Sequence, residues 1–128
     1  MIHSLCKEER LWGKRVISNL FENGHSFYMP PYKVVWISIS EAASFPVRFG
    51  VSVSKRCFKH AVKRNLIKRR TREAFRTNKQ ILHTAVTDGN QIHLIAIYTS
   101  DRLLPFIDLE NSMKKILQRI ARQYVEPA

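Results

Sequence analysis

Two stretches of the chain carry hydrophobic residues at every third or fourth position, which is the spacing of an amphipathic helix. Residues 11–23 form the first stretch, and Gly24 follows it where helices commonly end. Residues 109–124 form the second, and Asp108 stands before it as a candidate cap. The apolar stripes comprise Val16, Ile17, Leu20 and Phe21 in the first stretch, and Leu109, Met113, Ile116, Leu117, Ile120 and Tyr124 in the second. We expect both stripes to pack against a core, and Phe21 could also line a groove beside the turn.

Three shorter stretches, residues 33–40, 47–54 and 91–98, are rich in β-branched residues and predict strands. The last of them is nearly continuous in apolar residues at its end, so we expect it to be well buried. A long helical stretch separates the second strand from the third, and this order indicates a βαβ-type unit.

Side chains alternate between the two faces of a sheet, which divides the first predicted strand into two sets. Val35, Ile37 and Ile39 form one set, which we expect to face the core. Trp36 falls with Val34 on the opposite face. Taken alone, Trp36 is there either an ordinary sheet residue or a platform on which a nucleobase stacks.

The second predicted strand has one apolar face and one face that is small and polar. Phe49, Val51 and Val53 share the apolar face. The other face carries Arg48, Gly50, Ser52 and Ser54. A ligand backbone could approach this face closely and find hydroxyl partners, or the face could simply be the solvent side of an antiparallel sheet.

The long helical stretch, residues 59–80, separates its side chains by face. One side is an apolar packing set, comprising Ile67, Thr71, Ala74 and Phe75. Nearly opposite is a line of hydrogen-bond donors at i, i+4, i+7 and i+11, comprising Asn65, Arg69, Arg72 and Arg76. Further cations flank this line on both borders, namely Lys63, Arg64, Lys68 and Arg70. A helix with this many cations gains little stability from i,i+4 ion pairs of its own. Arginine guanidinium groups bind phosphate with two parallel hydrogen bonds, so the pattern favours an external anion as their partner.

Charge is concentrated in the same segment. The 22 residues from Lys55 to Arg76 contain ten of the chain's 22 Lys and Arg side chains and one acid, Glu73. The formal net charge of +12 favours a polyanionic partner. Nucleic acid is favoured over a membrane because no long apolar stretch exists. An ordinary solvated face explains the pattern less well, since clustered cations repel one another unless something neutralises them.

Length and composition indicate one RNA-binding domain over residues 1–128, with flexible ends at about 1–8 and 125–128. Hydrophobic residues make up 45% of the chain, enough for a packed core. Cys6 and Cys57 form no CxxC pair, and we expect no structural disulfide. The N-terminal residues include no apolar signal segment, so the expected localisation is cytoplasmic.

A protein-only nuclease would need clustered carboxylates to hold a divalent metal ion. The predicted strands contain no Asp or Glu, and the five histidines show no paired ligand spacing. We interpret Glu8 and Glu9 as charges at a helix start, and we predict no catalytic and no metal-binding residues in this chain. A structural RNA-binding protein, such as a ribosomal component, is an alternative that composition leaves open. The feature that argues against it is the aromatic, small-polar surface beside the arginine line.

The run from Gly50 to Arg56 (GVSVSKR), followed by the run from Ala61 to Arg76 (AVKRNLIKRRTREAFR), resembles the protein subunit of bacterial ribonuclease P. That family carries a GLSVSKK-type strand followed by a helix with an RNRIKR-type signature. The similarity is specific within residues 48–76 and looser on both sides. Residues 20–26 (LFENGHS) are similar to the end of the family's first helix and its Gly-x-Ser turn.

The resemblance implies an α+β fold, an α/β sandwich of about four strands with three helices of the ribosomal protein S5 domain 2-like type. It also implies a left-handed βαβ crossover, against the right-handed default. In this family the RNA partner supplies the active site and binds Mg²⁺, and the holoenzyme removes the 5′ leader of precursor tRNA. The implied partners are therefore the catalytic RNA and precursor tRNA, with no membrane.

Two surfaces carry over from the family by matched positions. The implied leader-binding cleft comprises Phe21, Val34, Trp36, Asn65, Arg69 and Arg72, to which we add Ser52 from the small polar strand face. The implied surface for the catalytic RNA comprises Lys55, Arg56, Lys63, Arg64, Lys68 and Arg70, to which we add Lys59.

The chain departs from the family pattern at three positions. Leu66 replaces the second Arg of the signature, so one RNA contact is missing or moved, and Arg70 is an extra cation nearby. Ile17 stands where the family has an aromatic residue one turn before Phe21. Tyr98 ends the third strand where members often have a basic residue.

Overall fold

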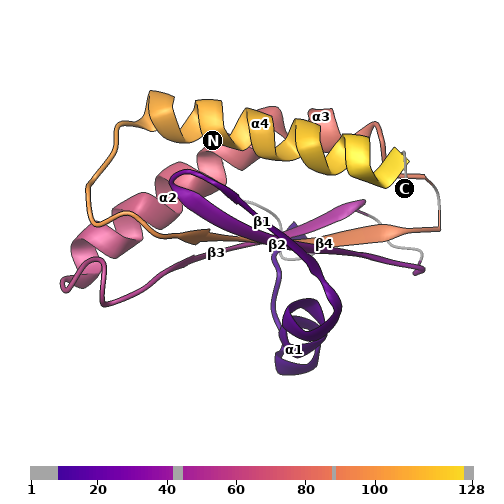
Figure 1. Cartoon of the computed structure of the whole chain (residues 1–128), viewed down its shortest axis with the longest axis horizontal. Helices are drawn as coiled ribbons and strands as arrows, with labels where there is room; N and C mark the ends of the chain where they lie inside the picture. The colour runs from indigo at the N-terminus through magenta and orange to yellow at the C-terminus, as the bar shows by residue number, and fades with distance from the viewer. Residues whose placement is uncertain (1–8, 42–44, 88, 126–128) are drawn as a thin grey trace.

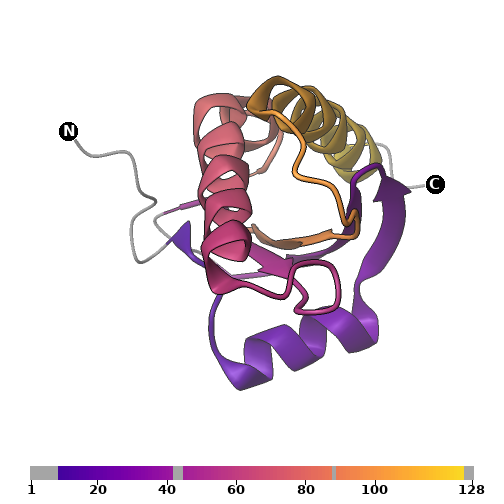
Figure 2. The same cartoon turned by 90° about the vertical axis from the view of Figure 1, so that its left-hand side faces the viewer.

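A twisted four-stranded sheet with the order β1-β2-β4-β3 divides the molecule into two unequal layers (Figure 1). The computed structural model describes residues 9–41, 45–87 and 89–125. Its elements in chain order are α1 (Lys14–Asn23), β1 (His25–Met29), β2 (Tyr32–Ile39), β3 (Val47–Val53), α2 (Ala61–Asn78), α3 (Gln80–His83), β4 (Gln91–Tyr98) and α4 (Phe106–Val125). Helices α2, α3 and α4 cover one face of the sheet, and α1 alone lies against the other (Figure 2).

The predicted βαβ unit is confirmed. Strands β3 and β4 pair in parallel, and α2 and α3 connect them. The other two pairings, β1 with β2 and β2 with β4, are antiparallel. Strand β3 is therefore an edge strand, and its free edge lies next to the N-terminal segment, where the Leu11 amide donates to the Phe49 carbonyl at 2.9 Å.

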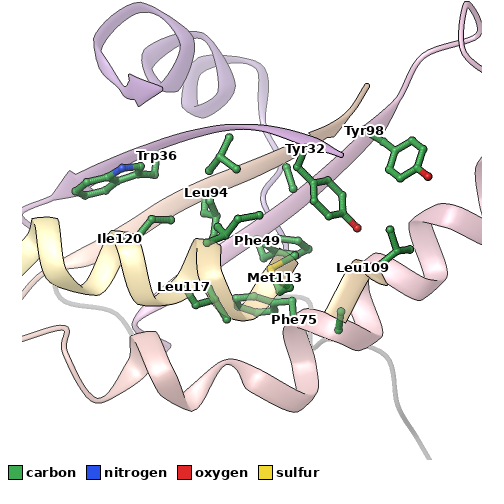
Figure 3. Close-up of a cluster of buried hydrophobic side chains, with 14 of the residues drawn as sticks. Tyr32, Trp36, Phe49, Phe75, Leu94, Tyr98, Leu109, Met113, Leu117 and Ile120 are labelled. Atoms are coloured by element: carbon green, nitrogen blue, oxygen red, sulfur yellow. The ribbon is translucent and has the colours of Figure 1, made fainter. Parts of the chain in front are cut away.

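The main core lies between the sheet and the layer of α2 and α4 (Figure 3). The predicted packing face of α2 is confirmed, because all four of its members are buried. Phe75 stacks on Phe49 of β3 with ring centroids 4.3 Å apart, and Thr71 shares a 2.7 Å hydrogen bond with the Tyr32 hydroxyl. The apolar stripe of α4 is likewise buried, apart from the half-buried Tyr124.

The prediction for the faces of β2 is wrong. Val34 and Trp36 are 0% and 4% exposed and belong to the main core, and Figure 3 shows Trp36 above Ile120 of α4. Val35 points to the other face, where it packs with Leu20 of α1. The physical reason is that α1 covers that face, so β2 is apolar on both sides and alternation alone cannot orient it.

Several element boundaries also differ from the predictions. The segment His25–Met29 forms β1, which local sequence did not indicate, and Gln80–His83 forms the additional one-turn helix α3. Helix α1 begins at Lys14 rather than residue 11. Helix α4 begins at Phe106, so Asp108 is an acid in its first turn rather than its cap.

One expectation for the N-terminal residues is wrong, and others concern residues outside the described part of the chain. Glu9 is not a helix-start charge, because it is buried and pairs with Lys79 of the α2–α3 junction at 2.7 Å. Glu8, Cys6 and the two ends expected to be flexible lie outside the described residues, apart from Val125, which ends α4. Cys57 is a free thiol.

Candidate nucleic-acid interface

The donor line predicted on α2 lies on the outer side of the helix, opposite its buried face. Asn65, Arg69 and Arg72 are exposed. Arg76, the last member, forms a bidentate pair with Glu73 at 2.7 and 2.9 Å. This hydrogen bonding raises the pKa of Arg76. Three members of the line are therefore presented to solvent, while the fourth is already engaged with a carboxylate.

The cations before α2 lie on a turn that the side chain of Ser54 stabilises. The Ser54 hydroxyl accepts hydrogen bonds from the amides of Arg56 and Cys57 at 3.1 and 3.3 Å. The side chains presented on this turn and on the first turn of α2 are exposed, namely Lys55, Arg56, Lys59 and Lys63. No acidic residue occupies the first turn of α2. The positive end of the helix dipole therefore adds to these cations and favours an anion here.

Two of the predicted RNA-binding arginines also hold the structure together. Arg64 donates from Nη1 to the carbonyls of Phe58 and Lys59, at 2.7 and 2.8 Å, and so braces the turn before α2. Arg70 donates from Nη1 to the Leu104 carbonyl at 3.1 Å and so fastens the loop after β4. Each guanidinium retains further N–H donors, which can contact RNA without breaking these bonds. Sequence reasoning gave no sign of this second role.

A cavity of about 490 Å³ opens at the free edge of β3, between the N-terminal segment and α2. Its lining consists of Arg10, Leu11, Trp12, Ile17, Phe49, Gly50, Val51, Arg72 and Ile95. Gly50 allows this arrangement, since a Cβ there would lie only 3.1 Å from the Cβ of Leu11. Of the predicted leader-binding residues, only Arg72 lines this cavity.

Two like charges share the cavity. Partial burial lowers the pKa of Arg72, and the neighbouring Arg10 lowers it further. Neither guanidinium forms an ion pair within residues 9–41, 45–87 and 89–125. Placing two such groups together costs Coulomb energy that a bound anion would remove.

The face of the sheet that carries α1 has an open row beside the helix. The pairing registers align Tyr28, Lys33, Ile97 and Ser52 across the four strands in that order. Tyr28 and Lys33 are exposed, while Ile97 and Ser52 are partly exposed. Ser52 therefore lies on the small polar face of β3, as predicted. Phe21, at the end of α1 on the same face, is 51% exposed.

The structure thus assembles a surface that differs in part from the predicted one. Val34 and Trp36 are absent from it because both are buried in the main core, where Trp36 lies near Ile120 of α4 (Figure 3). Lys33 lies on this surface instead, and the sequence contained a sign of this arrangement. If the strand is begun at Tyr32 instead of Lys33, the bulky residues fall on one face and the lysine marks the open one. Tyr28 left no comparable signal because β1 is short, and Trp12 left none because it stands outside the apolar stripe of the first predicted helix.

The described residues offer no protein metal centre and no membrane span. Within them, no three His, Cys, Asp or Glu side chains gather closely enough to hold a metal ion. No helix in the described part of the chain is long and apolar enough to cross a bilayer. The groups that the surface does present are guanidinium and ammonium donors, an exposed aromatic ring and a small polar strand.

Comparison with known proteins gives one consistent result. A protein-family model described as Ribonuclease P matches residues 5–121. The ribonuclease P protein component of Porphyromonas gingivalis is 39% identical over 118 residues, covering 91% of this chain and 86% of the relative. That of Chlorobium phaeobacteroides is 36% identical over 91 residues, or 69% and 62% of the two chains. Among solved structures, the RNase P protein of Staphylococcus aureus gives a TM-score of 0.64 at 25% identity, covering 92% and 99% of the chains. The RNase P protein of Thermotoga maritima gives a TM-score of 0.68 at 23% identity, covering 87% of this chain and 96% of that chain.

Proposed function

The chain belongs to the ribonuclease P protein family, and from this premise we propose how its surfaces divide between two RNAs. As a family member it is the protein subunit of an endoribonuclease ribonucleoprotein that processes tRNA 5′ ends. A partner RNA subunit follows from that membership. The alternative function, a purely structural RNA-binding protein, is set aside on the same match.

We propose that the single-stranded 5′ leader of precursor tRNA lies along the outer side of α2 and across the open row of the sheet. Asn65, Arg69 and Arg72 supply donors for phosphates and base edges, as arginine forks and amides do in other complexes. Ser52 and Lys33 form the polar floor of this path, and an unpaired base can stack on the exposed ring of Phe21. The observation that supports the path best is the exposure of all three donors on one side of α2.

We propose that the partner RNA docks on the turn before α2 and on the first turns of that helix. Lys55, Arg56, Lys59 and Lys63 are exposed there beside the start of α2, whose N-cap residue forms no side-chain hydrogen bond to the first amides. Lys68 extends this surface along α2. Arg64 and Arg70 take part through the donors that their structural bonds leave free.

The protein contributes charge and positioning to the proposed reaction, and the RNA contributes the catalytic groups. Mg²⁺ would be held mainly by RNA, because the described side chains form no carboxylate cluster for it. A protein of net charge +12 reduces the repulsion between two large polyanions, which otherwise requires more Mg²⁺.

Reconstitution of the partner RNA with and without this protein tests the proposal. We expect the protein to stimulate cleavage of precursor tRNA most strongly at low Mg²⁺ and to lower the KM more for substrates that carry a leader. Equal stimulation of substrates with long and minimal leaders would refute the leader path but leave the docking surface standing. Cleavage by protein freed of all RNA would refute the division of labour altogether.

A further inference from the structure

Trp12 presents a large aromatic side chain at the mouth of the cavity beside β3. The side chain is 55% exposed, although it follows a segment that is hydrogen-bonded to the sheet edge. A single exposed aromatic residue is common on protein surfaces and needs no special explanation. Trp12 becomes informative through its neighbours, because it shares the cavity with two guanidinium groups.

The cavity has the size and the chemistry for one nucleotide. Its volume of about 490 Å³ lies within the range of pockets that hold small ligands. One part is apolar and aromatic, lined by Trp12 and Ile17, which suits the face of a base. Another part carries Arg10 and Arg72, whose N–H groups suit a phosphate.

Trp12 and Ile17 give the wall of the cavity different chemistry. Ile17 offers no ring for stacking, yet it lines the same cavity as Trp12. The indole therefore supplies an aromatic face to the wall where the helix has only an aliphatic side chain. Gly50 keeps the floor of this cavity open, since it adds no side chain between Leu11 and the strand.

From this arrangement we infer that the cavity is a nucleotide subsite for the leader, in which one base stacks on Trp12 and the adjoining phosphate binds Arg10 and Arg72. The inference rests on the proposed function, because the leader is the strand that would reach this edge of β3. It adds Arg10 and Trp12 to the recognition surface and extends the path around the β3 edge.

Intrinsic fluorescence tests the subsite directly, because the chain contains two tryptophans in opposite environments. Trp12 is 55% exposed, whereas Trp36 is 4% exposed and buried beneath α4. Titration of the full chain with a single-stranded RNA of about eight nucleotides should quench the Trp12 emission, since a stacked base contacts its ring. The Trp12→Phe variant should bind the RNA and show no quenching, because only the shielded Trp36 remains. Equal quenching in this variant would overturn the inference.

Affinity measurements on the reconstituted holoenzyme provide a second readout. Trp12→Leu keeps apolar bulk but removes the ring, and we expect it to bind leader-bearing precursor tRNA about 5- to 100-fold more weakly. Trp12→Phe should retain most of the affinity. Arg10→Gln should weaken binding and lower the salt slope by about 0.7, the value for one contact on a single strand. Circular dichroism and thermal unfolding of each variant would establish that it folds.

The outcomes separate this inference from the proposed function. If the wild-type holoenzyme prefers leader-bearing substrate and Trp12→Leu does not change that preference, the subsite is wrong and the leader path stands. If the wild type binds substrates with and without a leader equally, the leader path fails and the subsite fails with it. Leaders shortened one nucleotide at a time should show an abrupt loss of the Trp12 effect at the nucleotide that occupies the cavity.

Discussion

Arg69 and Arg76 occupy the same line on α2, but their surroundings differ. Arg69 is exposed, and Arg76 is held by two hydrogen bonds to Glu73. A guanidinium that already has a carboxylate partner gains less from a phosphate than one bonded only to water. The chemistry of a position on this helix therefore depends on its partner as well as on its face.

We predict that Arg69→Ala weakens binding of leader-bearing precursor tRNA about tenfold, as expected for the loss of one charge-assisted hydrogen bond. Binding of mature tRNA, which has no leader, should change little. Arg76→Ala is the matched control and should have a smaller effect on both RNAs. Equal weakening of leader-bearing and mature tRNA by Arg69→Ala would remove Arg69 from the leader path.

His93 provides a prediction for stability, because it lies buried on β4 beside Arg48 of β3. Burial lowers its pKa, the Arg48 charge lowers it further, and Glu41 partly opposes them. Burial likewise lowers the pKa of His83, with an added contribution from Lys79 and partial opposition from Glu9. Both imidazoles are therefore harder to protonate in the folded chain than in the unfolded chain.

The unfolded chain consequently takes up more protons once the pH falls below about 6.5, the ordinary pKa of histidine. We predict that the free energy of unfolding is fully developed above that pH and decreases as the pH is lowered. Urea unfolding of wild type and His93→Leu between about pH 7 and 5 measures the effect, and the variant should show the shallower decrease. Identical pH profiles would exclude His93 as a contributor.

At the scale of elements, the corner between α1 and β1 depends on the small size of Gly24. Its backbone is extended (φ −79°, ψ 163°), so the glycine is not needed for a left-handed turn. It is needed for space, because a Cβ would collide with the backbone carbonyl of Leu20 and lie 3.0 Å from that of Trp36. The sequence predicted the correct residue as the helix end, but for a different physical reason.

We predict that Gly24→Ala destabilises the protein by about 1–3 kcal/mol, the usual range for overpacking. Gly50→Ala is the control, since its added Cβ would come no closer than 3.1 Å to any atom, the Cβ of Leu11 in the N-terminal segment. That variant should change stability much less. Denaturant titration of both variants gives the comparison, and equal costs would contradict the distinction between a collision with a backbone carbonyl at Gly24 and the longer contact at Gly50.

The elements that could be predicted from sequence are those with a single apolar face. Helices α2 and α4 and strand β3 each bury one face, and the residues expected there are buried, apart from the half-buried Val51 and Tyr124. Strand β2 is covered on both sides, so the alternation of its residues did not show which face meets the main core. The prediction therefore placed Val34 and Trp36 on the wrong face. Strand β1 is five residues long and is exposed at Tyr28, so only its pairing with β2 identifies it.

The candidate site likewise has a part that could be predicted from the sequence and a part that could not. The donor line of α2 could be predicted because helical spacing fixes which residues share a side. The cavity could not, because Arg10 and Arg72 are far apart in sequence and meet only through the pairing of the N-terminal segment with β3. The bonds of Arg64 and Arg70 to backbone carbonyls likewise depend on loops whose path no periodicity describes.

At the scale of the whole molecule, the excess of positive charge is unevenly placed. Lys55 to Arg76 carries ten of the 22 cationic side chains, and only Glu73 opposes them within that segment. Nonspecific attraction of RNA would be felt over the entire surface, whereas the release of counterions occurs only where phosphates come into contact. Salt dependence therefore distinguishes contact from general attraction.

We predict that Lys68→Ala lowers affinity for the partner RNA and reduces the slope of log K against log salt by about one. Lys63→Ala should behave in the same way, because both residues lie on the proposed docking surface. Lys114→Ala on α4 is the control, since it removes an equal charge from outside that surface and should leave the slope unchanged. Binding of the partner RNA at several salt concentrations measures all three slopes. If the three variants lower the slope equally, the RNA responds to net charge alone, and the docking surface on α2 is not a defined contact.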